Sequence, residues 1–393
     1  LMGMGEDIES LAWSVRQLKD RPSNLYVDNE VVVAGGWDGN ISCWDLDGIQ
    51  QWAITLSSRI QSICRYEQRL YVAAGLNAVA LNLNDGEILW SQTTEGSADA
   101  ILCSSDGELI VAISSVYDIE YGDFMESACW QYSNTGELLI VERMDERPWF
   151  STMFEGEIIL GLGRPRGGYL TINGSSSKWT ELIEDDPVTC GCSKGQHLVL
   201  GHAKGGLSFL EKGVIVNSKT LENGIEYISI HEDGYLLTFD TGGACLLDNK
   251  GKMQTESMGI DNALIFQSGL IIDGGRTSWL ISQNNDEHIL QICSINSGDE
   301  YINTPLGSLV TAYNSTDEHT VIGCEDGRIL LFEADLLNRR LTNRLSGKDD
   351  VGKISNNSTD EQKDSSSELS EADFDALEKR RIMQAKLRKL RDN

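Results

Sequence analysis

The chain has 393 residues, with 61 acidic and 32 basic side chains and a net charge of −29 at pH 7. Residues 1–346 carry 50 acidic and 22 basic side chains, so nearly all of the excess negative charge lies there. Such a surface repels nucleic-acid phosphates and anionic membranes at long range. No apolar run approaches the roughly 18 residues that span a bilayer. The composition therefore argues against a membrane protein and against nucleic-acid binding by this part of the chain.

The nine cysteines are scattered along the chain. Only Cys190 and Cys192 are close in sequence, and we interpret them as small core residues rather than a metal or redox site, because no further ligands lie nearby. The first residues show no basic segment followed by an apolar one, so no secretory signal is apparent. Reduced thiols without such a signal predict a cytoplasmic protein.

The segment 70–92, LYVAAGLNAVALNLNDGEILWSQ, best shows the unit that repeats along the chain. Leu70–Ala74 is an apolar run, Ala78–Leu83 alternates, and Asp85-Gly86 precedes a third run that carries Trp90. Asp-Gly between two such runs indicates a β-hairpin, because glycine adopts the positive φ that the turn requires. The segment therefore predicts three strands joined by two tight turns.

Similar units recur about every 40 residues, and a period near 40 with four strands per unit predicts a β-propeller, one unit per blade. The expected fold is all-β with eight blades. The second strands are centred on Val33, Val72, Val111, Leu160, Leu200, Leu237, Ile272 and Ile322. The innermost strands are expected at Ser23–Val27, Ile60–Arg65, Ala100–Ser104, Phe150–Phe154, Val188–Cys192, Tyr227–His231, Ala263–Gln267 and Leu309–Tyr313.

The eighth unit lacks a fourth strand. Thr320–Cys324 and Arg328–Glu333 supply its middle strands, but Leu336–Leu345 loses the β pattern. At the other end of the chain, residues 10–14 (SLAWS) resemble the fourth strand of the segment 70–92. We therefore expect an N-terminal strand at about residues 9–15 to complete the last blade and close the ring, which removes open sheet edges. Tryptophans at matching fourth-strand positions are expected to pack between neighbouring blades: Trp13, Trp52, Trp90 and Trp179.

Three segments resemble known propeller repeats. Val32–Leu46 (VVAGGWDGNISCWDL) resembles a WD repeat that ends in Trp44-Asp45, and Ile322–Glu333 (IGCEDGRILLFE) resembles the same unit without the Trp-Asp pair. Ala80–Trp90 (ALNLNDGEILW) resembles the tryptophan-docking motif of pyrroloquinoline-quinone-type propellers. The two resemblances together cover about residues 9–335 and imply the same architecture. These motifs are structural, and the vicinal cysteine pair of the quinone-dependent enzymes is absent, so no cofactor is expected.

Two blades depart from the regular period. Ser114–Ser127 in blade three and Gly274–Glu287 in blade seven are interpreted as inserted loops between the second and third strands. Loops longer than about 12 residues in a compact domain are often functional. The candidate contact residues are Tyr117, Tyr121 and Phe124 in the first loop and Trp279 in the second.

In a propeller, the turns between second and third strands share a face with the connections between blades. Arg147 and Trp149, and beyond them Arg164 and Arg166, are thereby expected beside the blade-three insertion. Together with Tyr121 and Phe124 they predict an aromatic and basic patch on an otherwise acidic body, suited to a protein partner. The alternative is that these loops fold over themselves and bury their own aromatic side chains.

The composition changes at the C-terminus. We expect the propeller to occupy residues 1–340, a disordered polar linker residues 341–370, and a basic helix residues 371–393. Phe374, Leu377 and Ile382 share one face of this helix, and a second short apolar face lies nearly opposite. This pattern predicts a helix that orders on a partner or forms a short coiled coil, with a solvated charged tail as the alternative.

Catalytic patterns are not apparent. The five histidines are dispersed, and the sequence has no phosphate loop, no Gly-x-Ser-x-Gly and no His-Glu-x-x-His. We therefore predict a non-enzymatic protein-interaction scaffold without metal or cofactor, which binds partner proteins through loops on one propeller face and through the tethered C-terminal helix. The alternatives are a propeller enzyme or ligand-binding protein that uses the central channel, or weak nucleic-acid association through the basic tail.

Overall fold

The structure is a computed structural model that describes residues 8–230, 234–241, 243–255, 263–272, 274–284, 287–295 and 297–351. The chain divides into two compact units, residues 1–344 and 345–393. Within the described ranges, no helix combines the length and the apolar composition needed to cross a membrane.

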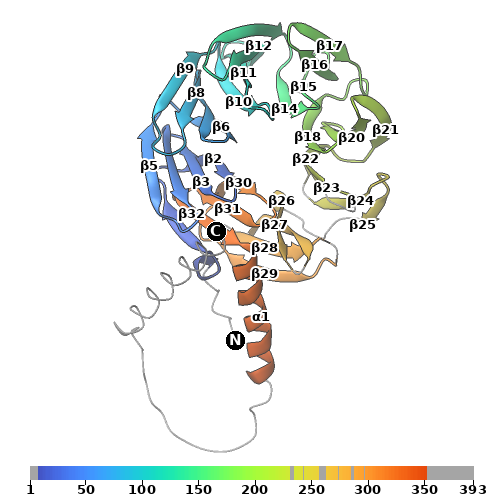
Figure 1. The fold of residues 1–393 in the computed structure, drawn as a ribbon. Helices are drawn as coiled ribbons and strands as arrows, with labels where there is room; N and C mark the ends of the chain where they lie inside the picture. Colours follow the sequence, from blue (N-terminus) through green and yellow to red (C-terminus); the bar gives the residue numbers. More distant parts are fainter. Residues whose placement is uncertain are drawn as a thin grey trace, which may run out of the picture. The chain divides into compact units, whose positions relative to one another are not determined.

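The first unit is a ring of eight four-stranded antiparallel sheets (Figure 1). This confirms the eight-bladed all-β propeller. Blades one to four comprise β2 (Pro22–Val27), β3 (Val31–Gly36), β4 (Asn40–Asp45) and β5 (Gln50–Thr55); β6 (Ile60–Tyr66), β7 (Arg69–Ala74), β8 (Asn77–Asn82) and β9 (Ile88–Thr93); β10 (Ser97–Cys103), β11 (Leu109–Asp118), β12 (Asp123–Ser133) and β13 (Leu138–Met144); and β14 (Pro148–Phe154), β15 (Glu157–Leu162), β16 (Tyr169–Asn173) and β17 (Ser176–Thr180).

The remaining four blades have the same order from the innermost strand outward. They comprise β18 (Val188–Lys194), β19 (His197–His202), β20 (Gly206–Glu211) and β21 (Val214–Thr220); β22 (Ile225–Ile230), β23 (Gly234–Phe239), β24 (Ala244–Asp248) and β25 (Met253–Thr255); β26 (Ala263–Ile272), β27 (Gly275–Asn284), β28 (Glu287–Ser294) and β29 (Glu300–Pro305); and β30 (Val310–Ser315), β31 (His319–Cys324), β32 (Arg328–Glu333) and β1 (Ser14–Gln17).

The N-terminal strand closes the ring as predicted, although it lies a few residues later than expected. β1 pairs antiparallel with β32, with Ser14 opposite Leu331 and Gln17 opposite Arg328. Residues 8–10 form a short 3-10 helix, η1 (Ile8–Ser10), instead of strand. The reason is burial, because Ile8 and the nearby Leu11 insert into the apolar cluster of the last two blades.

The seventh blade corrects one prediction. Ile272 ends the innermost strand β26 instead of centring the second strand, and the residues assigned to an inserted loop form the second strand β27. Trp279 is therefore a core residue, 1% exposed, and unavailable to a partner in this conformation. Thr277 and Ser278 gave the segment a loop-like composition, but both side chains are buried and hydrogen-bonded to main-chain carbonyls, Thr277 to Leu270 at 2.8 Å.

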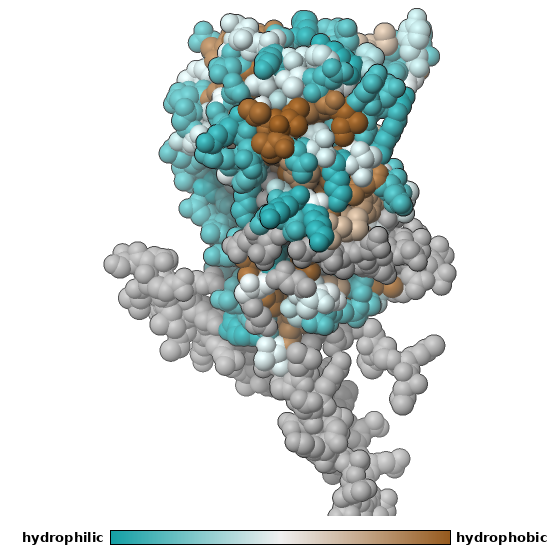
Figure 2. Space-filling view, turned by 90° about the vertical axis from the view of Figure 1, so that its right-hand side faces the viewer, coloured by the Kyte–Doolittle hydropathy of each residue, from teal (hydrophilic) through white to brown (hydrophobic). Residues whose placement is uncertain are grey.

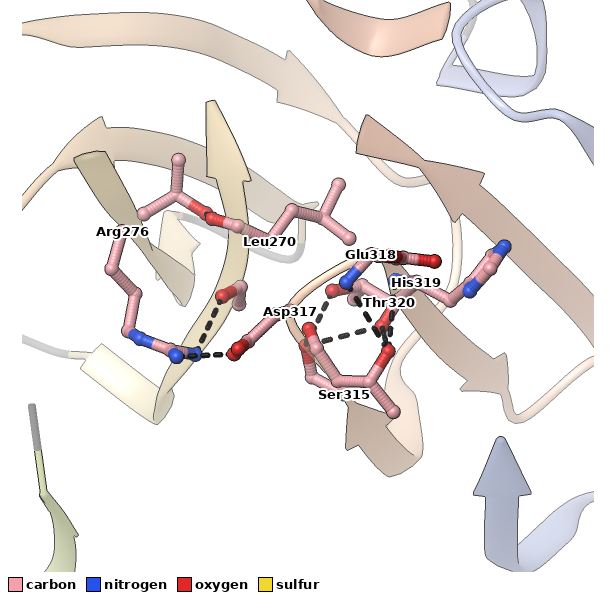
Figure 3. Close-up of polar contacts among 10 residues, drawn as sticks. Leu270, Arg276, Ser315, Asp317, Glu318, His319 and Thr320 are labelled. Atoms are coloured by element: carbon pink, nitrogen blue, oxygen red, sulfur yellow. Dashed lines mark hydrogen bonds and ion pairs between the residues drawn. The ribbon is translucent and has the colours of Figure 1, made fainter. Parts of the chain in front are cut away.

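Blades seven and eight are joined at the turn between β30 and β31. Figure 3 shows the Arg276 guanidinium pointing at the carboxylate of Asp317, with which it forms an ion pair. The Ile271 N–H donates to the Asp317 carbonyl at 2.9 Å, and the Ser315 and Thr320 hydroxyls lie 2.7 Å apart beside this turn. These contacts fix the turn against the neighbouring blade.

The tryptophans confirm the expected packing between blades at three junctions. The indole N–H of Trp13 donates to the Leu46 carbonyl at 2.7 Å, that of Trp52 to Leu83 at 2.6 Å, and that of Trp90 to Asn134 at 3.1 Å. Each acceptor lies in or beside the turn between the third and fourth strands of the next blade. Gly86 and Gly136 leave room there, because a Cβ on either would lie within 2.7 Å of the tryptophan ring. Trp179 differs, since it bonds to Gly167 of its own blade.

A helix follows the last strand. α1 (Ala334–Val351) begins where the Glu333 carboxylate accepts the N–H groups of Asp335 and Leu336, at 3.2 and 2.9 Å. Leu337 and Leu341 lie one helical turn apart and are buried in the apolar cluster of the last two blades. The predicted linker start at residue 341 is therefore wrong, because residues 341–351 are helical. The rest of the predicted linker and the helix 371–393, with Phe374, Leu377 and Ile382, lie outside the described residues.

We predict that Trp13→Phe lowers the free energy of unfolding by about 1 kcal/mol, because it removes the indole hydrogen bond to blade one but keeps an aromatic ring. Urea unfolding followed by circular dichroism measures the change. Trp149→Phe is the control, since the Trp149 side chain is exposed and its indole donates to no described residue. Equal midpoints for Trp13→Phe and the wild type would show that this contact does not hold the ring closed.

Candidate interaction site

The blade-three insertion is present, but as strand rather than loop. β11 and β12 have ten and eleven residues, and they stay paired beyond the blade with Ser115 opposite Ser127 and Tyr117 opposite Phe124. The Asp118 carboxylate closes the tip by accepting the N–H groups of Glu120 and Tyr121, at 2.7 and 3.2 Å. The predicted segment is thus a two-stranded ribbon, which holds its side chains in fixed alternation on two faces.

One face of this ribbon forms an aromatic cluster with the connection to blade four. The ring centres of Tyr117 and Phe124 are 5.0 Å apart, and those of Phe124 and Trp149 are 6.1 Å apart, both edge-to-face. The Arg147 guanidinium lies 3.9 Å from the Phe124 ring and 4.3 Å from the Trp149 ring. We call these four residues the hairpin cluster. Their contact confirms that the predicted segments lie side by side.

The charge of Arg147 is partly compensated from the innermost strand β10. Its guanidinium lies 3.4 Å from the Asp99 carboxylate, and both side chains are largely buried. Asp99 also accepts a hydrogen bond from the Ser115 hydroxyl. Arg147 Nε is buried without an acceptor. Arg147 is therefore a rigid support for the two rings, since a stacked guanidinium loses little further freedom on binding.

The tip of the ribbon stands free of the hairpin cluster. Ile119 is 87% exposed and Tyr121 is 77% exposed. Below them, Arg143 is neutralised by ion pairs with Glu95 and Glu126. The exposed contact surface is therefore apolar and aromatic at Ile119 and Tyr121, and the group of Arg143, Glu95 and Glu126 at its base carries one net negative charge.

Arg164 and Arg166 lie in the next blade, outside the hairpin cluster. Arg166 pairs with the buried carboxylate of Glu146 at 3.1 Å, and its guanidinium is 5.3 Å from the Trp179 ring. Arg166 and Met125 of the ribbon both line a hollow of about 600 Å³. Arg164 lines a second pocket, of about 330 Å³, together with Lys204 and several acidic residues. The segment 163–168 thus lies beside Arg147, whose carbonyl accepts the Gly163 N–H at 2.9 Å, while Arg164 and Arg166 line pockets next to the hairpin cluster.

Two exposed features escaped the sequence analysis. Figure 2 views the side of the ring on which β21 lies, where hydrophobic atoms appear among polar ones, and Val214, Ile215 and Val216 of this outer strand are exposed. On the same face of the propeller as the ribbon, the guanidinium groups of Arg21 and Arg59 both lie within 4.0 Å of the centre of the Trp37 ring. The first could have been found as an apolar run after Lys212-Gly213. The second unites residues from three separate loops, so no local pattern marks it.

Several polar side chains of the described innermost strands link neighbouring blades. The Ser23 hydroxyl donates to the Ile60 carbonyl and the Thr189 hydroxyl to the Ile225 carbonyl, each at 2.6 Å. The Gln61 amide donates to the Ser97 hydroxyl at 2.8 Å. Among the described residues, no three His, Cys, Asp or Glu side chains are grouped as metal ligands.

A buried His–Ser pair resembles part of a catalytic triad but has a structural role. His202 Nδ1–H donates to the main-chain carbonyl of Asp186 at 2.7 Å, so Nε2 accepts from the Ser208 hydroxyl at 2.9 Å. The Asp186 carboxylate instead binds the N–H groups of Lys204 and Gly206. His202 and Ser208 are at most 1% exposed. A substrate cannot reach this serine, and the network serves to fix the turn between β19 and β20.

The burial of His202 predicts a pH dependence of stability. Desolvation lowers the pKa of His202, although its bond to Asp186 opposes the shift. The unfolded chain therefore binds this proton more readily, and stability is lost as pH falls below the ordinary histidine value of about 6.5, by up to about 1.4 kcal/mol per pH unit. Urea midpoints measured between pH 7 and 5 should fall less steeply for His202→Gln than for the wild type. His197→Gln, at an exposed site, should keep the wild-type slope; equal slopes for all three proteins would contradict the prediction.

Comparison with known proteins finds likeness in fold alone. No protein family and no curated protein sequence matches the chain. Among solved structures, Sqt1 of Saccharomyces cerevisiae superposes with a TM-score of 0.66 at 11% identity, covering 84% of this chain and 100% of Sqt1. BamB from Moraxella catarrhalis gives 0.65 at 12% identity, covering 81% and 98%. The WD40 propeller domain of Doa1 gives 0.50 at 11% identity, covering 82% and 96%. The chain is an eight-bladed β-propeller related in fold to the WD40 and BamB propellers.

Proposed function

We propose that this protein is a non-enzymatic, cytoplasmic interaction scaffold that binds a partner protein through the blade-three ribbon and the hairpin cluster. The observation that carries the proposal is the exposed ribbon tip, Ile119 and Tyr121, held on a support of stacked aromatic rings and Arg147. Exposed aromatic side chains with few rotamers are typical anchors of protein interfaces, because little conformational entropy is lost when they are buried.

The fold supports this proposal. Propellers of the WD40 kind are commonly protein-interaction scaffolds, and a closed ring presents its loops at fixed positions. The net charge of −28 over residues 1–346 disfavours nucleic acid as the partner of this surface. Several polar side chains of the described innermost strands are used in contacts between blades, which favours the loop-bearing face over the central channel as the binding site.

A second contact remains a prediction from the sequence. The basic, apolar segment 371–393 could add to the affinity of the ribbon, because tethering raises the local concentration of a weak site. A truncation that tests it should end after Val351, since Leu337 and Leu341 belong to the core of the propeller.

The ribbon is tested by the double variant Ile119→Ala/Tyr121→Ala. Affinity capture from the source organism, quantified by mass spectrometry, should lose the wild-type partners, with a decrease of tenfold or more expected when two anchors are removed. The control is Ile49→Ala/Leu138→Ala, which removes two apolar side chains, each about half exposed, next to turns of the opposite face. Retention of every partner by the ribbon variant, or equal loss in the control, would contradict the proposal.

A further inference from the structure

A second arginine–aromatic group lies on the same face as the ribbon, over blades one and two. Arg21 precedes β2, Trp37 begins the turn between β3 and β4, and Arg59 precedes β6. The main-chain N–H of Trp37 donates to the main-chain carbonyl of Arg21 at 3.1 Å, which holds these two segments together. The guanidinium carbons of Arg21 and Arg59 lie 4.0 and 3.6 Å from the centre of the Trp37 ring. We call these three residues the rim arginine site.

The two positive charges of this site lack a close counterion. The only carboxylate within ion-pair distance of Arg21 in the described part of the chain is Glu325, at 3.9 Å, with both side chains about half exposed; such a pair contributes little. Arg59 forms no ion pair and no side-chain hydrogen bond with the described residues, and its Nε is buried without an acceptor. Burial and the charge of Arg21 both lower the pKa of Arg59, and the charge of Asp99 only partly opposes this shift.

Several other arginines of the ring are bound to acidic side chains. Arg65 pairs with Asp28 and Glu30, Arg143 with Glu95 and Glu126, and Arg328 with Glu9 and Asp326. Although residues 1–346 contain 50 acidic side chains, none of the described ones lies within ion-pair distance of Arg59. Two like charges that are held against one ring, with free N–H donors, form a site that an incoming anion stabilises.

We propose that the rim arginine site binds a carboxylate of an acidic segment in the partner protein, so that the interface extends from the ribbon to blade one. This inference rests on the proposed function. The guanidinium fork matches a carboxylate in a bidentate manner. Leu76 is 55% exposed in the turn that begins at Gly75, whose N–H donates to the Arg59 carbonyl at 3.0 Å. The site therefore offers an apolar contact beside the charge, which suits a peptide that alternates acidic and apolar side chains.

The rim arginine site and the hairpin cluster are electrostatically connected. Asp99, which pairs with Arg147, also acts on Arg59 through its charge. Both groups lie on the face that carries the connections between blades, so a segment that lies across blade two would pass from one group towards the other. Phosphate-rich ligands fit less well, because the surrounding negative charge repels dense polyanions more strongly than single carboxylates.

The test is a fluorescence-anisotropy titration of the full chain with a fluorescein-labelled hexapeptide of alternating glutamate and leucine. Binding should weaken about tenfold for Arg59→Gln and further for Arg21→Gln/Arg59→Gln, because charge-assisted hydrogen bonds are lost. The control Lys178→Gln/Lys194→Gln removes two exposed positive charges from other blades and should bind as the wild type does. Equal affinity of the wild type and the rim variants, or no binding to the wild type, would overturn the proposal. Tighter binding of the matching phosphoserine–leucine peptide would overturn the assignment to a carboxylate.

Stability measurements separate binding from a structural role. Arg59→Gln should shift the urea midpoint little, because the loss of stacking on Trp37 is offset by the removal of a like-charge repulsion from Arg21. A clear destabilisation would make Arg59 a packing residue and contradict the proposal. Affinity capture separates the two proposals. If Ile119→Ala/Tyr121→Ala loses the partner proteins but Arg21→Gln/Arg59→Gln keeps them, the proposed function stands and the proposal for the rim arginine site is wrong.

Discussion

The pairing of β1 with β32 is the contact on which the rest of this structure depends. It joins residues more than 300 positions apart in the sequence. The main-chain N–H of Trp13 donates to the Leu331 carbonyl at 2.7 Å, and that of Leu18 donates to the Gly327 carbonyl at 2.8 Å. Without this pairing the last blade would expose the edge of β32, and blade one would lose the indole hydrogen bond from Trp13 to Leu46. Closure turns eight separately marginal sheets into one body, since each sheet buries its faces against the two beside it.

Neighbouring blades contact one another at both their inner and their outer ends, and the outer contacts differ around the ring. At the inner ends, Gly35 and Gly323 approach Ile60 and Pro22 so closely that a Cβ would lie 2.4 and 2.7 Å away. At the outer ends, tryptophans bridge successive blades from the eighth to the third. The ribbon and the rim arginine site both lie on blades one to three, where these bridges are found. Both proposed contacts are therefore carried by the part of the ring with the most regular junctions.

The sequence was most informative where the repeat is regular. Tight turns such as Asp85-Gly86 and apolar runs such as Leu70–Ala74 report local structure, so the blade count and the ring closure could be predicted. The strands of blade seven could not be predicted, because Thr277 and Ser278 are polar residues typical of loops, although both are buried in the structure. Trp279 was misassigned for the same reason.

The candidate site shows the same division. Tyr117, Phe124, Arg147 and Trp149 could be grouped because propeller topology places their two segments side by side. The segment of Arg166 also lies beside them, since the Gly163 N–H donates to the Arg147 carbonyl at 2.9 Å, but the ion pair that holds the Arg166 side chain on the buried Glu146 is invisible to pattern analysis. The rim arginine site was missed because its three residues belong to different loops, and its defining property is a missing counterion, which only the assembled fold reveals.

Amide hydrogen exchange of β1 tests the central claim most directly. If closure makes the ring one cooperative body, the N–H groups of Trp13 and Leu18 should exchange as slowly as those of β31 and β32, in a single step that follows global unfolding. Rapid exchange at Trp13 and Leu18 while β31 stays protected would mean that the N-terminal strand is dispensable, and would contradict this account of how the propeller is held together.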